Sequence, residues 1–408
     1  MGKENLIVGL DIGTTKIAAI IAELQESGEP KIVGIGTSRS EGLKRGVVIN
    51  LEKTVESITK AVEDAELMAG IKVNSVFAGI AGDHIRSINS RGVIAISRSG
   101  HEIVPSDVER VINAAKTVAL PMDREIIHVL PQEYTVDDQS GIKDPIGMSG
   151  VRLEVEVHIV TGAVTSAQNI YRSVRKAGLE VCDFVLQSLA SSYALLTPDE
   201  EELGVALIDL VGGTTDIAIF HEGSIRHTAV IGVGGKNVTN DIAIGLRTSV
   251  QQAEEIKKSY GCALSALVDS DEMIKVPGLG GGDEKDISRS VLAAIIEPRA
   301  EEILSLILRE MKKTNYSNLL AAGVVLTGGG SLLEGMTDLA EQIFDMPVKK
   351  GIPQGFSGLV DIVSTPIHST GVGLILYGSE QLGDGKSKGL SKEKGLFRRM
   401  KNLFSQYL

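Results

Sequence analysis

The chain has 408 residues, too many for one compact core, and this length predicts about two or three domains. Its composition, 43% hydrophobic and 23% charged, is ordinary for a soluble globular protein, and a net charge of −12 argues against a nucleic-acid-binding protein, whose binding face is basic. The two cysteines lie in unrelated contexts, so we expect no disulfide framework. The seven histidines lack zinc-binding spacing, so we expect no structural zinc. We also expect no membrane-spanning helix, which needs about 20 apolar residues, and no secretory leader.

The first element in chain order is a segment over residues 6–20 that reads as apolar strand, Asp11, glycine turn, Thr14-Thr15 and apolar strand. This order is typical of a tight β-hairpin. Glycine in the turn lets backbone N–H groups approach an anion, and the threonine hydroxyls add donors. A plain Asp-Gly hairpin has the same pattern, so one copy alone does not identify a phosphate site.

A helix and a strand follow the first hairpin. Asn50 is a capping residue, apolar residues recur at helical spacing, and Gly70 ends the helix. Residues 73–80 have the composition of a buried strand. Strands that alternate with helices indicate α/β layers.

The stretch from about 84 to 163 has a different pattern. Strands are expected over 91–98, 126–136 and 151–160, and a capping box at Ser106 opens a helix that runs through Val118. We interpret this stretch as a small inserted α+β subdomain. A helix over 166–178 then resumes the α/β pattern.

Residues 205–220 repeat the first hairpin, with Asp209 before the glycine turn and Thr214-Thr215 after it. An aspartate beside a phosphate is repelled unless a cation lies between them. Two such turns far apart in the sequence therefore predict a clamp on Mg²⁺ and a nucleotide polyphosphate. Further helices are expected over 251–260 and about 288–313, with a glycine-rich loop at 277–283 between them.

The C-terminal tail differs in composition from the rest of the chain. Residues 383–394 are polar and rich in Gly, Ser and Lys, which predicts a flexible linker. Residues 395–408 predict an amphipathic helix, and from Asp384 onward seven Lys and Arg stand against two acids, which is typical of an interfacial helix on an anionic membrane. The alternative is a terminal helix docked on the protein's own core. The membrane-facing candidates are Leu396, Phe397, Arg398, Arg399, Met400, Lys401, Leu403, Phe404, Tyr407 and Leu408.

Several of these segments together resemble one family. The resemblance depends on five motifs: the two phosphate turns, 11–16 and 209–216, the glycine loop 326–331, and the connecting helices 186–193 and 369–373. They make the chain similar to the actin/Hsp70/sugar-kinase ATPase superfamily. Within it, the resemblance to the FtsA family of bacterial cell-division proteins covers nearly the whole chain, and Leu130-Pro131-Gln132-Glu133-Tyr134 and Ser149-Gly150-Val151-Arg152 look specific to that family.

The resemblance implies an α/β, actin-like ATPase fold, in which two similar halves surround a nucleotide cleft. It also implies an inserted α+β subdomain and a C-terminal amphipathic helix. The implied subdomains are 1A (1–83, 164–195 and 369–382), 1C (84–163), 2A (196–242 and 306–368), 2B (243–305), a linker (383–394) and a membrane-targeting helix (395–408).

The same resemblance implies which residues bind ATP and Mg²⁺. Asp11 and Asp209 would hold Mg²⁺ through water. The β- and γ-phosphates would lie against Gly13, Thr14, Thr15, Lys16, Gly212, Gly213 and Thr214, and the nucleoside against Gly328, Gly329 and Gly330. Glu254 and Lys257 match a Glu-x-x-Lys pair that contacts the nucleoside in the superfamily, and one helical face carries both. A solvent-exposed salt bridge is the alternative for this pair.

Two positions bear on hydrolysis. The family usually has a third glycine where this chain has Val211, which does not easily adopt a left-handed conformation and could crowd the phosphates. Gln187 is the candidate for positioning the attacking water, with a residue on the helix surface as the alternative. A neutral amide positions water without taking its proton, so we expect at most slow ATP hydrolysis.

The implied function is an actin-like, ATP-binding protein that polymerises on the cytoplasmic membrane at the division site. It would tether the FtsZ ring there, as a peripheral membrane protein, and recruit later division proteins through the inserted subdomain. Arg289 and Arg299 are candidates for binding the acidic C-terminal peptide of FtsZ, with exposed helix charges as the alternative. Other readings are a sugar-kinase-like phosphotransferase, a chaperone of the Hsp70 type and a pilus-assembly ATPase-like protein. We find no catalytic Asp for a kinase, and the chain is too short for the chaperone's substrate domain.

Overall fold

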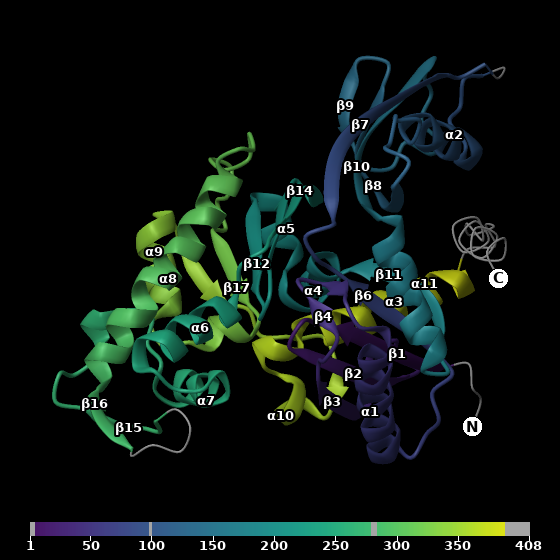
Figure 1. Cartoon of the computed structure of the whole chain (residues 1–408). Helices are drawn as coiled ribbons and strands as arrows, with labels where there is room; N and C mark the ends of the chain where they lie inside the picture. Colours follow the sequence, from purple (N-terminus) through teal and green to yellow (C-terminus); the bar gives the residue numbers. More distant parts are fainter. Residues whose placement is uncertain (1–4, 98–99, 279–283, 388–408) are drawn as a thin grey trace. The chain divides into compact units, whose positions relative to one another are not determined.

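The computed structural model describes residues 5–97, 100–278 and 284–387 (Figure 1). Their packing divides the chain into two compact units. The first contains the described parts of Met1–Ile80, Gln168–Leu195 and Ile352–Leu408, and the second contains Ala81–Ala167 and Leu196–Gly351. This division groups the inserted stretch with the second half. The finer subdomain boundaries given above stay a prediction.

The first unit is built on a six-stranded sheet in which β1 and β2 form the predicted hairpin. Ile7, Leu10, Ile17 and Ile20 are fully buried, because the pleat turns alternate apolar residues to each covered face. The strands, in pairing order, are β11 (Glu180–Leu186), β6 (Ser75–Ile80), β1 (Leu6–Ile12), β2 (Lys16–Leu24), β3 (Pro30–Arg39) and β19 (Ser357–Gly358). A separate small hairpin pairs β4 (Leu43–Lys44) with β5 (Val47–Val48).

Helices cover this sheet. The helix α1 (Leu51–Ala69) packs on β3 and β2, and it begins and ends as predicted: Asn50 accepts from the Lys53 N–H at 3.1 Å, and Gly70 is left-handed at φ 67°. The contact with β3 is so close that a Cβ on Gly36 would lie 2.0 Å from the Ala61 carbonyl oxygen. The other helices of this unit include α3 (Val164–Lys176), which begins in the second unit, α4 (Gln187–Leu195), α10 (Val360–Val363), η5 (Pro366–His368) and α11 (Ser369–Ser387).

The helix α11 packs on β1 and α4 and continues to Ser387. The prediction of a flexible linker over 383–394 is therefore wrong for its first five residues. A helix extends easily from a packed segment because propagation costs far less than nucleation. The rest of that linker, and the predicted amphipathic helix at 395–408, lie outside the described residues. No helix in the described ranges is long and apolar enough to cross a membrane.

The inserted stretch forms a four-stranded sheet with one helix packed against it (Figure 1). Leu153, Val155, Val157 and Ile159 enter one core with Val111 of the helix, as their alternation predicts. The strands, in pairing order, are β7 (Arg86–Ala95), β10 (Arg152–Ala163), β8 (Arg124–Val136) and β9 (Gln139–Ile142), and the helix is α2 (Pro105–Ala115).

Two local predictions for the insert are wrong. Its first strand spans 86–95 rather than 91–98. The helix begins at Pro105 rather than after Ser106, and it ends at Ala115. Proline at the first helical position has a preset φ and lacks an N–H that would be unsatisfied there. Asp107 then caps the helix by accepting from the Val104 N–H at 3.2 Å.

The second half has a five-stranded sheet that contains the other predicted hairpin, β12 with β13. The sheet order is β14 (Ser224–Ile231), β13 (Thr215–His221), β12 (Val205–Leu210), β17 (Val324–Thr327) and β18 (Val348–Lys350). Around it stand α5 (Pro198–Leu203), α6 (Gly235–Leu246), α7 (Val250–Tyr260), η2 (Ser265–Leu267), α8 (Arg289–Met311), η4 (Gly329–Leu332), α9 (Met336–Phe344) and the pair β15 (Met273–Val276) with β16 (Lys285–Ser288).

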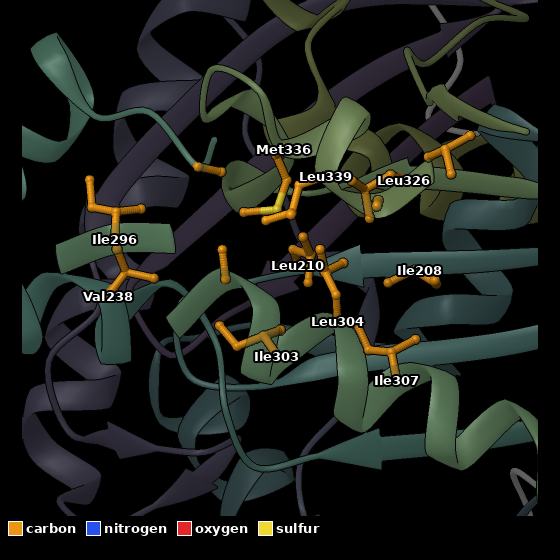
Figure 2. Close-up of a cluster of buried hydrophobic side chains, with 14 of the residues drawn as sticks. Ile208, Leu210, Val238, Ile296, Ile303, Leu304, Ile307, Leu326, Met336 and Leu339 are labelled. Atoms are coloured by element: carbon orange, nitrogen blue, oxygen red, sulfur yellow. The ribbon is translucent and has the colours of Figure 1, made fainter. Parts of the chain in front are cut away.

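The core of this half joins α8 and α9 to the sheet. Figure 2 shows Ile303, Leu304 and Ile307 of α8 beside the buried strand residues Ile208 and Leu210. All five are at most 4% exposed. Burying side chains of this size stabilises the fold by roughly 1.5–3 kcal/mol each.

The insert packs on β14, the edge strand of the second-half sheet. The Gln132 amide donates to the Ile225 carbonyl at 2.7 Å, and the Ser87 hydroxyl donates to the Thr228 carbonyl at 2.9 Å. Glu133 lies 3.8 Å from Arg226 as an ion pair. The motif 130–134 therefore joins the insert to the edge of a sheet, where backbone groups would otherwise lack strand partners.

Candidate phosphate turns

The first phosphate turn is closed by its own backbone. The Gly13 N–H donates to the Lys16 carbonyl at 3.0 Å, and a Cβ on Gly13 would lie 2.8 Å from that oxygen. Thr14 is buried and its hydroxyl oxygen accepts from the Gly46 N–H at 3.1 Å, whereas Thr15 is exposed. The turn therefore exposes the Thr15 side chain, whereas the Gly13 N–H and the Thr14 hydroxyl oxygen already have partners within the protein.

Asp11 lies at the end of β1 and is only 8% exposed. Burial raises the pKa of its carboxyl group, and Lys16, whose Nζ is 4.0 Å from Asp11 Oδ2, partly offsets that rise. The Lys16 ammonium also donates to the Ile367 carbonyl at 2.7 Å, just before α11. A buried carboxylate is stabilised by a cation, so this environment suits a metal ion near Asp11.

Gln187 is the first residue of α4, and the structure brings it to the turn. Its amide donates to Asp11 Oδ1 at 3.1 Å, and the residue is 3% exposed. A Cβ on Gly79 would lie 3.1 Å from Gln187 Cγ, so the glycine makes room for the side chain. This position excludes the alternative of a glutamine on the helix surface.

The second turn is held by the start of α6. The Val211 and Gly212 carbonyls accept from the N–H groups of Gly235 and Lys236 at 2.9 and 2.8 Å. A Cβ on Gly234 would lie 2.3 Å from the Val211 oxygen, so this approach requires glycine. Asp209 is 2% exposed and lies near the end of β12. Asp11 has the matching position near the end of β1.

Side chains of this turn also interact with each other. The Thr214 hydroxyl donates to Asp216 Oδ2 at 3.1 Å, and both residues are buried. Val211 is not among the non-glycine residues with positive φ in the described ranges, and neither Gly212 nor Gly213 has a positive φ. The valine therefore carries no left-handed strain, which removes that concern raised by the sequence.

The glycine loop lies against the second turn. Gly328 has φ 80°, and a Cβ there would lie 2.3 Å from Asp209 Oδ1. A Cβ on Gly330 would lie 2.8 Å from the Leu210 Cβ, whereas Gly329 has nothing within 4 Å of that position. The loop therefore presents open backbone at Gly329 next to the buried Asp209.

Glu254 and Lys257 form an ion pair on α7, with Nζ 2.7 Å from Oε2. Their side chains are 34% and 16% exposed, and both bond to Thr239 of α6, so the pair is not a solvent salt bridge. Thr239 was not predicted from the sequence. The one feature of the sequence that could have indicated Thr239 is its position one helical turn after Gly234-Gly235.

Arg289 and Arg299 already bond to acids of their own unit. Arg289 pairs with Glu272 at 2.9 Å and with Glu334, and its side chain is 14% exposed. Arg299 pairs with Asp241 at 2.5 Å and with Glu302, and it is 28% exposed. These bonds raise the pKa of both guanidinium groups. An acidic ligand must therefore compete with these carboxylates.

Each turn, taken by itself, has groups that suit a magnesium ion and a phosphate. Mg²⁺ is commonly held by one or two carboxylates together with phosphate oxygens and water, and Asp11 and Asp209 are buried carboxylates beside glycine turns. Within the described ranges, no cluster of three or more His, Cys, Asp or Glu could hold a metal ion. At either aspartate, phosphates and water would have to supply the other ligands.

Comparison with known proteins agrees with this architecture. The model of the family "Cell division protein FtsA" matches residues 206–373, and "SHS2 domain inserted in FTSA" matches residues 82–161. A cell division protein FtsA of Pseudomonas aeruginosa is 53% identical over 386 residues, which cover 95% of this chain and 92% of that protein. The chain belongs to the FtsA family. The Escherichia coli K12 member is 41% identical and the alignment covers 94% of this chain and 92% of that protein.

The FtsA family assignment confirms the resemblance found in the sequence and a role in cell division. Solved structures confirm the actin-like fold. The PilM-PilN type IV pilus biogenesis complex matches with TM-score 0.66 at 16% identity, covering 92% of this chain and 98% of that chain. MreB5 of Spiroplasma citri bound to ADP matches with TM-score 0.58 at 15% identity, covering 95% and 100%.

Proposed function

We propose that this FtsA-family chain binds Mg-ATP and forms actin-like filaments on the cytoplasmic face of the cell membrane. There it attaches the FtsZ ring and recruits later division proteins. The observation that carries the nucleotide part is the repeated hairpin. Asp11 and Asp209 are each the last but one residue of a buried strand that leads into a glycine turn, in two different sheets.

In this proposal, Asp11 and Asp209 would hold Mg²⁺ through water, and the two turns would hold the phosphates. Mg²⁺, when bound, neutralises phosphate charge beside the two aspartates. Gln187, held at Asp11 Oδ1, orients a water molecule. Because its amide does not accept a proton at neutral pH, hydrolysis is slow. An MreB5 of known structure binds ADP and AMPPNP, which supports a nucleotide as the ligand.

The membrane part rests on the sequence of residues 395–408. Seven apolar residues at helical spacing lie beside Arg398, Arg399 and Lys401. Each basic residue near an anionic surface contributes about 1 kcal/mol, so a single tail binds reversibly. Several tails on one filament would bind far more tightly, because attachment of the first tail raises the effective concentration of the others.

The partner part concerns α8, which carries Arg289 and Arg299. We propose that these guanidinium groups bind the acidic C-terminal peptide of FtsZ by exchanging their present carboxylate partners for those of the peptide. The inserted subdomain, residues 84–163, is the proposed contact for the next subunit and for later division proteins, and the match to the inserted SHS2 domain covers most of it.

Co-sedimentation with vesicles tests the tether. The full chain and a chain that ends at Lys394 are each mixed with Mg-ATP and vesicles that contain anionic phospholipid. We expect only the full chain to pellet with the lipid, and to lose binding at high salt or with zwitterionic vesicles. If both chains stay in the supernatant, the tail does not bind membrane and the tether proposal fails.

A further inference from the structure

The ammonium group of Lys16 connects the first phosphate turn to a segment far along the chain. Lys16 is the first residue of β2, and its backbone carbonyl closes the turn by accepting from the Gly13 N–H. Its Nζ donates to the Ile367 carbonyl at 2.7 Å and lies 3.4 Å from His368 Nδ1. Both partners belong to the short helix η5, directly before α11. All of these contacts lie within the first unit.

The imidazole ring of His368 is an acceptor for this ammonium group. Burial, together with Lys16, lowers the pKa of His368 to about 3, so the ring is neutral at pH 7. An ammonium group has donors and no acceptor, so a neutral ring that faces it with Nδ1 carries its own proton on Nε2. The contact is long for a hydrogen bond, but the charge on its donor strengthens it.

These two contacts hold Lys16 apart from Asp11. Nζ lies 4.0 Å from Asp11 Oδ2, which is an ion-pair distance but exceeds the roughly 3.2 Å limit of an N–H···O hydrogen bond. The side chains of Lys16 and Asp11 are only 25% and 11% exposed, so water screens their attraction in part. Without a competing acceptor, the lysine would therefore close on the carboxylate.

A direct bond between Lys16 and Asp11 would obstruct the first turn. The carboxylate oxygen would no longer be available to a hydrated Mg²⁺, and the ammonium group would be bound to a carboxylate in place of a phosphate. Breaking such a partly buried pair has a cost, which a ligand would have to overcome. The Ile367 acceptor is a backbone group, so His368 is the side chain through which this arrangement can be altered.

We propose that His368 is a positioning residue that holds the Lys16 ammonium group away from Asp11, so that Lys16 binds a phosphate and Asp11 binds hydrated Mg²⁺. This inference rests on the proposed binding of Mg-ATP and concerns the first phosphate turn only. His368 acts through Lys16 and does not touch the nucleotide. Loss of the ring acceptor should therefore weaken binding of the outer phosphates and leave the contacts of the rest of the nucleotide unchanged.

The test compares the Kd of the full chain for Mg-ATP and for AMP, measured by equilibrium dialysis. AMP lacks the β- and γ-phosphates that the turns are proposed to hold. In His368→Leu, which removes the acceptor, we expect Mg-ATP to bind about 10-fold more weakly and AMP to bind as in the native chain. His368→Asn keeps an acceptor at the δ1 position, so its affinity for Mg-ATP should stay close to that of the native chain.

The matched control is Tyr377→Phe on α11. This change also removes one partly buried hydrogen bond of the first unit, but the Tyr377 hydroxyl donates to Asp183 of β11 at 3.0 Å rather than to the turn. It should change neither Kd. Thermal unfolding without nucleotide shows whether each variant folds. If His368→Leu does not fold, His368→Ala replaces it, because alanine removes the acceptor without adding bulk.

The outcomes separate the inference from the function beneath it. A native chain that binds no nucleotide overturns the proposed function and this inference with it. A native chain that binds Mg-ATP, together with a His368→Leu variant that binds it equally well, overturns only the inference. So does a His368→Leu variant that weakens Mg-ATP and AMP by the same factor, or a His368→Asn variant that weakens Mg-ATP as much as leucine does. Either result would indicate a purely structural role for the ring.

Discussion

At the scale of single residues, the neighbours of a charged group decide what it can do. Asp11 and Asp209 have the same local sequence context and similar burial. Arg299, by contrast, is only partly exposed on α8 and has both Asp241 and Glu302 as partners. Its charge is therefore already balanced, and the strength of any peptide contact depends on how readily those partners are exchanged.

Arg299→Ala should weaken binding of the acidic FtsZ peptide by roughly 10-fold. The change removes a guanidinium donor and leaves two nearby carboxylates that repel the peptide. Arg309→Ala, at an exposed position of the same helix, is the control and should change affinity little. Fluorescence anisotropy with a labelled peptide measures both, and equal affinities of the two variants would contradict the assignment.

At the scale of elements, the junction of the insert with β14 depends on buried neutral histidine. His158 of β10 is 1% exposed, lies 2.7 Å from Asn89 Oδ1, and accepts from the Thr228 hydroxyl at 2.9 Å. Burial, together with His227 and His128, lowers the pKa of His158 to about 3. Burial also lowers the pKa of His128 to about 4. Burial therefore disfavours the protonated form of both histidines.

We expect the junction to open in acid. Above pH 6.5, His158 is neutral in both the folded and the unfolded chain. Between about pH 6.5 and 3 only the unfolded chain binds the proton, so stability falls by about 1.4 kcal/mol per pH unit for this group. His158→Gln should remove that part of the slope. Hydrogen exchange of the β10 and β14 amides at pH 7 and pH 5 measures it, and an unchanged slope would contradict the account.

At the scale of the whole molecule, the two phosphate turns belong to different compact units. A chain of two units need not unfold in one step, so a single melting temperature does not describe it. A ligand that both turns hold stabilises both units by mass action, by about 2.7 kcal/mol at a concentration of 100 times Kd.

Mg-ATP should therefore slow hydrogen exchange in both the β1–β2 and the β12–β13 hairpins. Asp11→Asn, which changes charge with little change in shape, should remove the Mg²⁺-dependent protection from both. The control is Asp183→Asn, a carboxylate in the first unit that accepts from the Tyr377 hydroxyl at 3.0 Å and lies outside the turn. If Mg-ATP protects only one hairpin of the native chain from hydrogen exchange, the proposal that both turns hold the nucleotide is wrong.

The sequence by itself determined the local parts of this protein. The two hairpins, the caps of α1 and the alternation in β10 were predicted, because turn chemistry and side-chain period act within a few residues. Predictions of element ends failed where a neighbouring residue competed, as Pro105 did with Ser106. The pattern also placed each aspartate before its turn, which is why the candidate phosphate residues could be named.

Only the tertiary structure decided which distant groups meet. Gln187 reaches Asp11 across 176 positions, Lys16 reaches Ile367 across 351, and Thr239 joins Glu254 from another helix. The insert likewise covers β14 through Gln132 and His158. Such contacts follow from how sheets and helices pack their apolar faces. Packing is a property of the whole unit, and no period or motif within one segment encodes it.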